Sequence, residues 1–491
     1  MAQNFLACDR EQPFLLPPDV REWLPENHLA WFVIDAVGVM DLSRFYAAYR
    51  EDGHGRAAYE PSMMVALLLY CWSRGSRSSR VIERACVEDV ACRVVAAQQR
   101  PDHATIARFI ERHETALGEL FGEVLTLCAD AGLATVGVIA IDGTKVAANA
   151  NRDRTLNYEQ IAKAIIDEAI QTDAAEDAVH GDRRGDELPE IVATTQGRRG
   201  WLRAAAQRLE QQRAEAAEPI ARARPERLLE TKRRLEEDLA VERHANERYE
   251  AYRARGVMTD GRRFGGPPKP FVVPDTPASK INTSDPDSKL VHGMRGWVQG
   301  YNAQAACNEQ HLIVAAEVMT ASPDFGHLGP MLTSAQAELE AAGVTDTPGV
   351  VVADAGYWHL EQMNEITGEG IPVLIPPDSS RRKSPRPGWD GGAYTFMRSV
   401  LATDYGSALY KQRAQLIEPI FGNTKHNRGF TRFQRRGRSA ARTEWRLIAT
   451  THNLVKLHRH FTAPPTKPPA APLASPRSES PGSTAFRDNL R

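Results

Sequence analysis

The chain has 491 residues, a formal net charge of −2 and 42% hydrophobic residues, enough for roughly two to four domains with ordinary cores. Its six cysteines contain no Cys-x-x-Cys pair, which is typical of free thiols in a reducing compartment. The N-terminus lacks the apolar core of a signal peptide, and no apolar run reaches the ~18 residues of a membrane span. We therefore expect a soluble, cytoplasmic protein without a membrane partner.

Residues 1–130 have the pattern of successive short helices. The segment "PSMMVALLLYCWSRG" starts with Pro61 at a first helical position and ends at Gly75, and "PDHATIARFIERHETALGELFGEVLTLCADAGL" offers Asp102 or Thr105 as an N-cap. Two interpretations of this region remain open, a DNA-binding helical domain and a helical bundle with a solvated charged face. The arginines that both interpretations must explain are Arg74, Arg77, Arg80, Arg84, Arg108 and Arg112.

The pattern changes to β-strands at Ala134. The run "ATVGVIAIDGTKVAA" is apolar, "GYNAQAACN" and "HLIVAAEVM" predict two strands joined by a turn near Asn308, and "GVVVADAGYW" and "GIPVLIPP" predict two more. Long apolar strands followed by helices predict an α/β fold with a mixed central sheet flanked by helices.

Between these strands lies a mainly helical insertion, residues 159–280. Its Ala-, Glu-, Arg- and Leu-rich middle predicts two long helices broken near Pro219 and Pro225, forming a hairpin on the main domain, and "GGPPKPFVVPDTPASK" predicts a linker. The Pro-, Ala- and Ser-rich tail, residues 463–491, is expected to be disordered.

Three acids are candidate metal ligands. Asp142 and Asp354 each lie where an apolar strand is expected to end, at the rim of a sheet where sites of α/β folds form, and Glu418 lies early in a late helix. Mg²⁺ prefers oxygen ligands, and two such ions about 4 Å apart can activate one oxygen and stabilise another in phosphodiester displacement. The alternative is that each acid only forms a turn or caps a helix, as the Asp142-Gly143 pair would.

Glu418 precedes a segment rich in basic residues, which suggests a polyanion nearby and a metal ion between the two. Glu418 and Lys425 are two helical turns apart and should share a face, whereas Arg413 should lie about 140° around the helix. Phe430 and Phe433 could stack on bases, but buried packing is favoured for them. The arginines expected to bind a nucleic-acid backbone are Arg428, Arg432, Arg435, Arg436 and Arg438.

Taken together, these segments resemble a DDE-type transposase of bacterial insertion sequences. Tyr410, Arg413, Glu418 and Lys425 match that family's Y-x2-R-x3-E-x6-K signature with one extra residue between the arginine and the glutamate. Other segments resemble the family's two aspartate motifs, its central hairpin, its N-terminal helical region and the stretch after the catalytic glutamate. These segments are "VIAIDGTKVAANAN", "VVADAGYW", "TSDPDSKLVHGMRGWVQGYNAQAACNEQHLIVAAEV", "YEPSMMVALLLYCWSRGSRSSRVIERAC", "RPDHATIARF", "EPIFGNTKHNRGFTRFQRRG" and "EWRLIATTHNLVKLHRH".

The resemblance implies an RNase H-like catalytic domain at residues 131–158 and 281–462, joined to a DNA-binding domain at residues 1–130. It implies that Asp142, Asp354 and Glu418 bind Mg²⁺ (or Mn²⁺), and that Lys425, Tyr410 and Arg413 contact phosphate or a displaced base. It further implies cleavage at the inverted repeats that end an element, joining of the 3′-OH ends to double-stranded target DNA, and a homodimer that pairs two ends. Two alternatives remain open: a nuclease that does not join DNA, and a non-catalytic DNA-binding relic.

Overall fold

The computed structural model describes residues 20–49, 57–180, 224–256, 270, 272–293, 296–379, 384 and 391–463. The chain divides into two compact units, one made of residues 1–148 with 290–491 and the other of residues 149–289. The N-terminal helices therefore share a unit with the central sheet. The second unit extends beyond the predicted insertion at both ends. The first predicted helix of that insertion, residues 201–220, and the tail after residue 463 lie outside the described residues.

The N-terminal region is helical, as predicted, and its helices begin at the expected signals. Pro61 is the first residue of α3, and the Asp102 side chain caps α6 by accepting a hydrogen bond from the Thr105 N–H at 2.8 Å. The elements are η1 (Val20–Trp23), α1 (Leu29–Val39), α2 (Ser43–Tyr46), α3 (Pro61–Ser73), α4 (Ser79–Glu88), α5 (Val90–Val95), α6 (His103–Arg112) and α7 (Glu114–Asp130).

A mixed six-stranded sheet forms the centre of the first unit, in the order β4-β5-β1-β7-β8, and β6 also pairs with β5. β1 pairs antiparallel with β5 and parallel with β7, so the change from antiparallel to parallel pairing falls on β1. The predicted strands are all present, and Asn308 closes the β5–β6 turn by accepting hydrogen bonds from the N–H groups of Gln310 and Leu312. The strands are β1 (Val138–Ala147), β4 (Lys289–Gly293), β5 (Gly296–Cys307), β6 (Ile313–Met319), β7 (Val350–Ala353) and β8 (Val373–Leu374).

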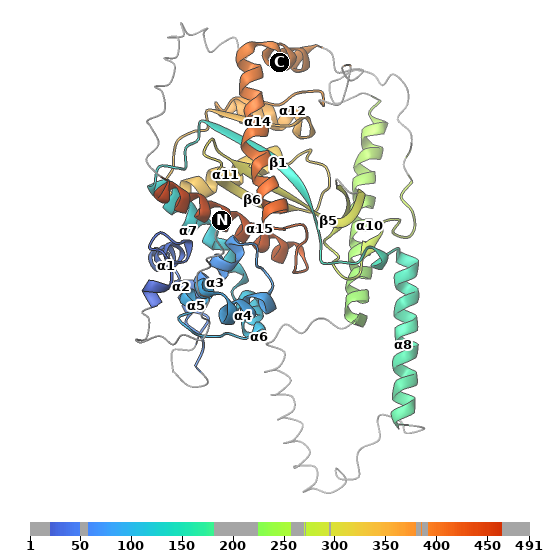
Figure 1. Ribbon diagram of the computed structural model, residues 1–491. Coiled ribbons are helices and arrows are strands. Elements are labelled where there is room, and N and C mark those ends of the chain that lie inside the picture. The colour runs from blue at the N-terminus through green and yellow to red at the C-terminus, as the bar shows by residue number, and fades with distance from the viewer. Residues whose placement is uncertain are drawn as a thin grey trace, which may run out of the picture. The chain divides into compact units, whose positions relative to one another are not determined.

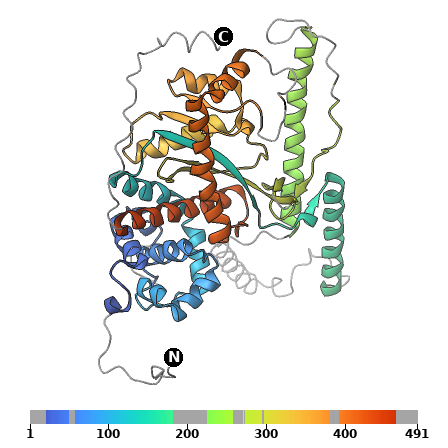
Figure 2. The same cartoon turned by 45° about the horizontal axis from the view of Figure 1, so that its top comes forward.

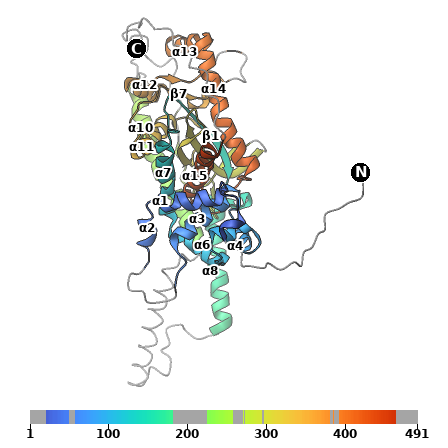
Figure 3. The same ribbon diagram turned by 60° about the vertical axis from the view of Figure 1, so that its left-hand side comes forward.

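Helices cover both faces of this sheet. Figures 1 and 2 show α14 crossing β1, and Figure 3 shows α14 and α11 on opposite sides of the strands. Because successive side chains of a strand point to opposite faces, β1 presents one set of groups to α14 and the other to the loop before α11. The elements are α11 (Leu328–Ala341), η4 (Ala355–Tyr357), α12 (Leu360–Gly368), α13 (Gly392–Ala402), α14 (Asp404–Gly422), the π-helical turn η5 (Asn423–Asn427) and α15 (Arg438–Thr462).

α15 packs against β6, α7 and α3, and so joins the sheet to the N-terminal helices. The Trp445 indole is 1% exposed and donates to the Gln304 carbonyl at 2.7 Å, which fixes the helix against β5. The predicted apolar stripe is confirmed as buried core: Trp445, Leu447, Ile448, Leu454 and Leu457.

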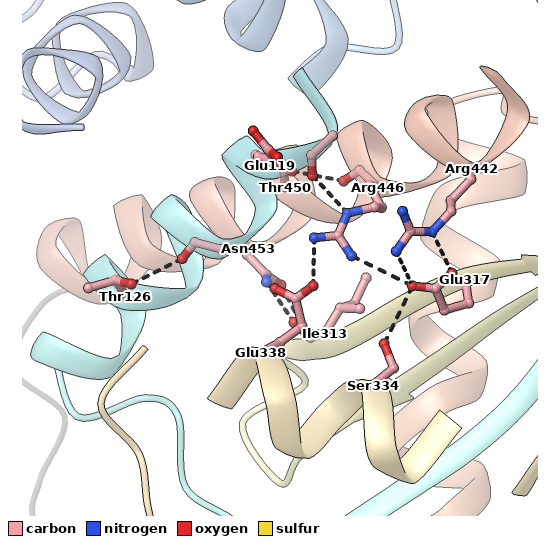
Figure 4. A network of polar contacts seen from close by, with 12 residues as sticks. Glu119, Thr126, Ile313, Glu317, Ser334, Glu338, Arg442, Arg446, Thr450 and Asn453 are labelled. Atoms are coloured by element: carbon pink, nitrogen blue, oxygen red, sulfur yellow. Dashed lines mark hydrogen bonds and ion pairs between the residues drawn. The ribbon is translucent and has the colours of Figure 1, made fainter. Parts of the chain in front are cut away.

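Arginines of α15 add a polar network to this junction (Figure 4). Arg446 donates to the Gly118 carbonyl of α7 at 2.7 Å and pairs with Glu338 of α11 at 2.6 Å. Arg442 makes a two-pronged pair with Glu317 of β6, at 2.6 and 2.7 Å. These charge-assisted hydrogen bonds connect α15 to α7 on one side and to α11 and β6 on the other. They strengthen the link between the N-terminal helices and the sheet within the first unit.

The second unit, taken by itself, is a helical pair closed by a short strand pair. It contains η2 (Arg152–Arg154), β2 (Thr155–Leu156), α8 (Tyr158–His180), α10 (Arg224–Ala254) and β3 (Ile281–Asn282). α10 has Pro225 in its first turn, in agreement with the predicted break. Its small core joins the two helices through Ile161, Leu228, Leu235 and Ile281.

Two predictions from composition can be compared with the described ranges. Five cysteines lie in those ranges, and all five are free and buried. Among the helices of the same ranges, none is both long enough and apolar enough to cross a membrane.

Candidate active site

Parallel pairing of β1 with β7 brings two of the predicted ligands together. Ile141 is in register with Ala353, so Asp142 and Asp354 occupy the next position on neighbouring strands. Asp354 directly follows β7, as predicted, and its Oδ1 accepts the Gly356 N–H at 2.8 Å. Asp142 does not end its strand, because pairing with β5 continues to Ala147 and places this residue in the middle of β1.

Arg413 of α14 lies between Asp142 and the third predicted ligand, Glu418. Its Nη1 is 2.8 Å from Asp142 Oδ2 and its Nη2 is 3.7 Å from Glu418 Oε1. Arg413 was expected to lie about 140° around the helix from Glu418 and not on its face. Its long side chain nevertheless reaches both carboxylates. The Glu418 side chain is 62% exposed, whereas that of Asp142 is 18% exposed.

The two aspartates are in an environment that disfavours their charge. Burial raises the pKa of Asp142 to about 6, with Asp354 and Asp324 adding to the rise and Arg413 opposing it. Burial also raises the pKa of Asp354. A cation would favour the charged form of both groups.

The donor set suits a hard divalent cation. Carboxylate oxygens are the ligands that Mg²⁺ prefers, and the Arg413 guanidinium already holds a positive charge beside two of them. Among the described residues, no three His, Cys, Asp or Glu side chains are gathered closely enough to hold a metal ion. The residues fit a divalent cation by the chemistry of their oxygen donors.

The other two signature residues lie near this group. Tyr410 is half-buried, and burial raises its pKa. Lys425 donates from Nζ to the Lys145 carbonyl of β1 at 2.9 Å, and burial lowers its pKa. Lys425 lies in the π-helical turn beyond the end of α14, so the expected spacing of two α-helical turns from Glu418 does not apply.

The basic segment after Lys425 divides into structural and exposed residues. Arg428 was expected to bind DNA, but it is buried and donates to the carbonyls of Trp72 at 2.9 Å and Ile448 at 3.0 Å, so it belongs to the core. Arg435 forms an ion pair with Glu114 of α7. Arg432 and Arg436 are exposed.

Further members of this segment serve packing or the fold. Phe430 and Phe433 are fully buried, which confirms the interpretation favoured for them. Arg438 is exposed and donates from Nε to the Val318 carbonyl at 2.9 Å.

Sequence reasoning missed a polar group beside the aspartates. Asp324, in the loop between β6 and α11, accepts from Asn302 and Gln304 of β5 at 2.8 Å each and from Lys145 of β1 at 3.2 Å. Its signal was available, since an acid shortly after an apolar strand is the same pattern that selected Asp354. The two amides could not have been found, because only the β1–β5 register places them beside Gly143 and Lys145.

Comparison with known proteins identifies the fold and then the family. Residues 207–454 match the family described as "Transposase DDE domain", and residues 18–112 match "Transposase domain (DUF772)". The DDE domain implies an RNase H-like fold, and the chain is of the class of DNA-cleaving enzymes. Because the first match covers half of the chain, the protein belongs to the transposases with a DDE domain. No curated protein and no solved structure matches it.

The longer match contains Asp354 and Glu418 but begins after Asp142. The place of Asp142 in the site therefore rests on its register with Asp354 and on its contact with Arg413.

Proposed function

We propose that this transposase binds the terminal inverted repeats of an insertion sequence, hydrolyses a phosphodiester bond at each end and joins the 3′-OH ends to target DNA. The observation that carries the proposal is that Asp142 of β1 and Asp354, directly after β7, follow the paired residues Ile141 and Ala353, with Arg413 linking Asp142 to Glu418. Asp142 and Glu418 come from separate elements and share the Arg413 guanidinium, which supports a cation site, while Asp354 beside them also caps η4 through Oδ1.

In this proposal Asp142, Asp354 and Glu418 hold Mg²⁺ or Mn²⁺. Such ions supply Lewis-acid activation of the attacking oxygen and stabilise the leaving oxygen. Arg413, once released from Asp142, and Tyr410 contact the phosphate or a displaced base, and Lys425 holds the phosphate from the π-helical turn. These groups orient the DNA strand, which is the main contribution a protein makes to phosphoryl transfer.

DNA affinity outside the site is assigned to exposed cations. Arg432 and Arg436 supply backbone contacts near the site, and Arg80, Arg84 and Arg108 do so on the N-terminal helices that read the inverted repeats. Arg77 is excluded from this set because its guanidinium stacks on the Phe430 ring at 4.4 Å. A homodimer would pair the two ends of an element.

The test compares the wild-type protein with Glu418→Gln on labelled end DNA in Mg²⁺. Glu365→Gln, an exposed glutamate of α12, is the matched control. We expect the wild type and the control to cut and join, and Glu418→Gln to bind DNA without either reaction. A Glu418→Gln protein as active as the control would refute the metal assignment of Glu418.

The same assay separates the two other functions. Cutting without joining would favour a nuclease. Binding by the wild type without cutting would favour a non-catalytic relic. Asp142→Asn and Asp354→Asn should behave as Glu418→Gln does.

A further inference from the structure

Asp324 holds one of its two carboxylate oxygens in a fixed position. Oδ1 accepts hydrogen bonds from Asn302 Nδ2 at 2.8 Å, from Gln304 Nε2 at 2.8 Å and from Lys145 Nζ at 3.2 Å. Two of these donors belong to fully buried residues of the central sheet. This oxygen is fully engaged, and the direction of the other oxygen is thereby set.

The other oxygen, Oδ2, lies in the neighbourhood of the Asp354 carboxylate. A Cβ atom added to Gly356 would lie 3.6 Å from Asp324 Oδ2 and 2.9 Å from Asp354 Oδ1, so both oxygens border the same small space. Within the described part of the chain, no hydrogen bond to Asp324 Oδ2 is found. Gly356 keeps this space open because it has no side chain.

A buried amide oxygen without a partner lies near Asp324 Oδ1. Asn302 is fully buried, and its Oδ1 has no hydrogen-bond partner among the described residues. It and Asp324 Oδ1 lie 2.7 and 2.6 Å from the position of a Cβ on Gly143, the residue after Asp142. An unsatisfied amide oxygen in a carboxylate cluster is a donor suited to a hard cation or its bound water.

The local charges are not balanced. Arg413 pairs with Asp142 and Glu418, and Lys145 pairs with Asp324. Asp354 forms no ion pair with any described residue. A divalent cation beside Asp354 would neutralise the excess of negative charge.

We propose that Asp324 is a further ligand of the divalent cation, binding through Oδ2 near Asp354 while Asn302 and Gln304 fix Oδ1. The inference rests on the proposed function and adds a fourth carboxylate to its three. The competing role is purely positional, in which Asp324 serves only to hold the Lys145 ammonium.

Mn²⁺ binding to the full-length protein without DNA, followed by electron paramagnetic resonance, distinguishes these roles without any activity readout. Asp324→Asn keeps the shape and an acceptor at Oδ1, and Asp346→Asn, an exposed position before β7, is the matched control. We expect Asp324→Asn to weaken Mn²⁺ binding by about tenfold or more, since even groups outside the ligand shell contribute that much. We expect Lys145→Met to strengthen it, because it removes a competing positive charge.

Opposite signs for these two variants support the ligand role. Weakening by both, or an Asp324→Asn protein that binds Mn²⁺ as the control does, overturns it. In that case Asp354→Asn still reports on the proposed function: its loss of Mn²⁺ binding would leave that function intact, and its normal binding would refute both.

A second variant covers the case in which Asp324→Asn unfolds. Gly356→Ala retains every polar group but places a methyl group between Asp354 Oδ1 and Asp324 Oδ2. We expect it to weaken Mn²⁺ binding by about tenfold. Unchanged binding would show that the two carboxylates share no ion and would overturn the proposal.

Discussion

Arg413 Nη1 lies 2.8 Å from Asp142 Oδ2 and thereby joins α14 to the centre of the sheet. Both side chains are largely buried, and the Asp142 charge raises the pKa of Arg413 although burial opposes it. The guanidinium occupies one side of a carboxylate that the proposed reaction needs for a metal ion. The two cations must therefore compete for Asp142.

Arg413→Gln should separate these two effects. Without metal, it leaves the Asp142 carboxylate without its charged partner, and the free energy of unfolding should fall by about 1–3 kcal/mol. Mn²⁺ should bind more tightly, because no guanidinium has to be displaced. Urea unfolding in EDTA and Mn²⁺ titration measure the two changes, with the exposed Lys411→Gln of the same helix as control. Wild-type values in both measurements would show that Arg413 does not compete with metal.

Gly143→Ala should destabilise the protein through crowding. An added Cβ would lie 2.3 Å from Gln304 Nε2, 2.6 Å from Asp324 Oδ1 and 2.7 Å from Asn302 Oδ1, all too close for a real contact. We expect a loss of roughly 1–3 kcal/mol in the free energy of unfolding, measured by urea denaturation.

Gly38→Ala is the control for that substitution. It lies in α1 with no atom within 4 Å of the added Cβ, and should stabilise the helix by about 0.5 kcal/mol. Equal effects of the two substitutions would contradict the crowding at Gly143.

Substitution of Arg428 should lower the stability of the protein, whereas substitution of Arg432 should weaken its binding to DNA. Arg428→Leu removes buried donors to two carbonyls and should lower the free energy of unfolding by about 2–3 kcal/mol. Arg432→Gln, at an exposed position, should change stability by less than about 0.5 kcal/mol but reduce the slope of log DNA affinity against log salt by about one. Denaturation and binding at several salt concentrations test both, and a reduced salt slope for folded Arg428→Leu would restore it as a DNA contact.

The sequence predicted the parts of the site that depend on local pattern. Apolar runs identified the strands and selected Asp142 and Asp354 at their expected ends. Glu418 was selected because it precedes a basic segment, and it lies near the end of α14 and not early in a helix as expected. What could not be predicted depends on packing between distant segments. The sequence shows only that Arg428 belongs to a basic run. Its burial depends on the packing of α3 and α15, whose Trp72 and Ile448 carbonyls accept its hydrogen bonds. The contact of Arg413 with Asp142 likewise requires the packing of α14 on β1.

His452 of α15 should make the protein sensitive to acid. The ring is buried and its Nε2 lies 3.0 Å from the His311 carbonyl, so Nε2 carries the proton of a neutral imidazole that donates to this oxygen. Burial lowers the pKa of His452 from 6.5 to about 3, and the nearby Arg428 charge contributes in the same direction.

The sign follows from proton counts in the two states. Between about pH 3 and pH 6.5 the unfolded chain protonates this histidine and the folded protein does not, so the free energy of unfolding decreases as the pH falls. The contribution of one such group approaches about 1.4 kcal/mol per pH unit well below pH 6.5. His452→Gln keeps a donor for the His311 carbonyl but cannot titrate, so its stability should depend less steeply on pH. Urea denaturation from pH 5 to 7.5 measures the difference, with His460→Gln on the exposed end of α15 as control. A His452→Gln profile parallel to that of the wild type would show that this histidine is protonated in the folded protein as readily as in the unfolded chain.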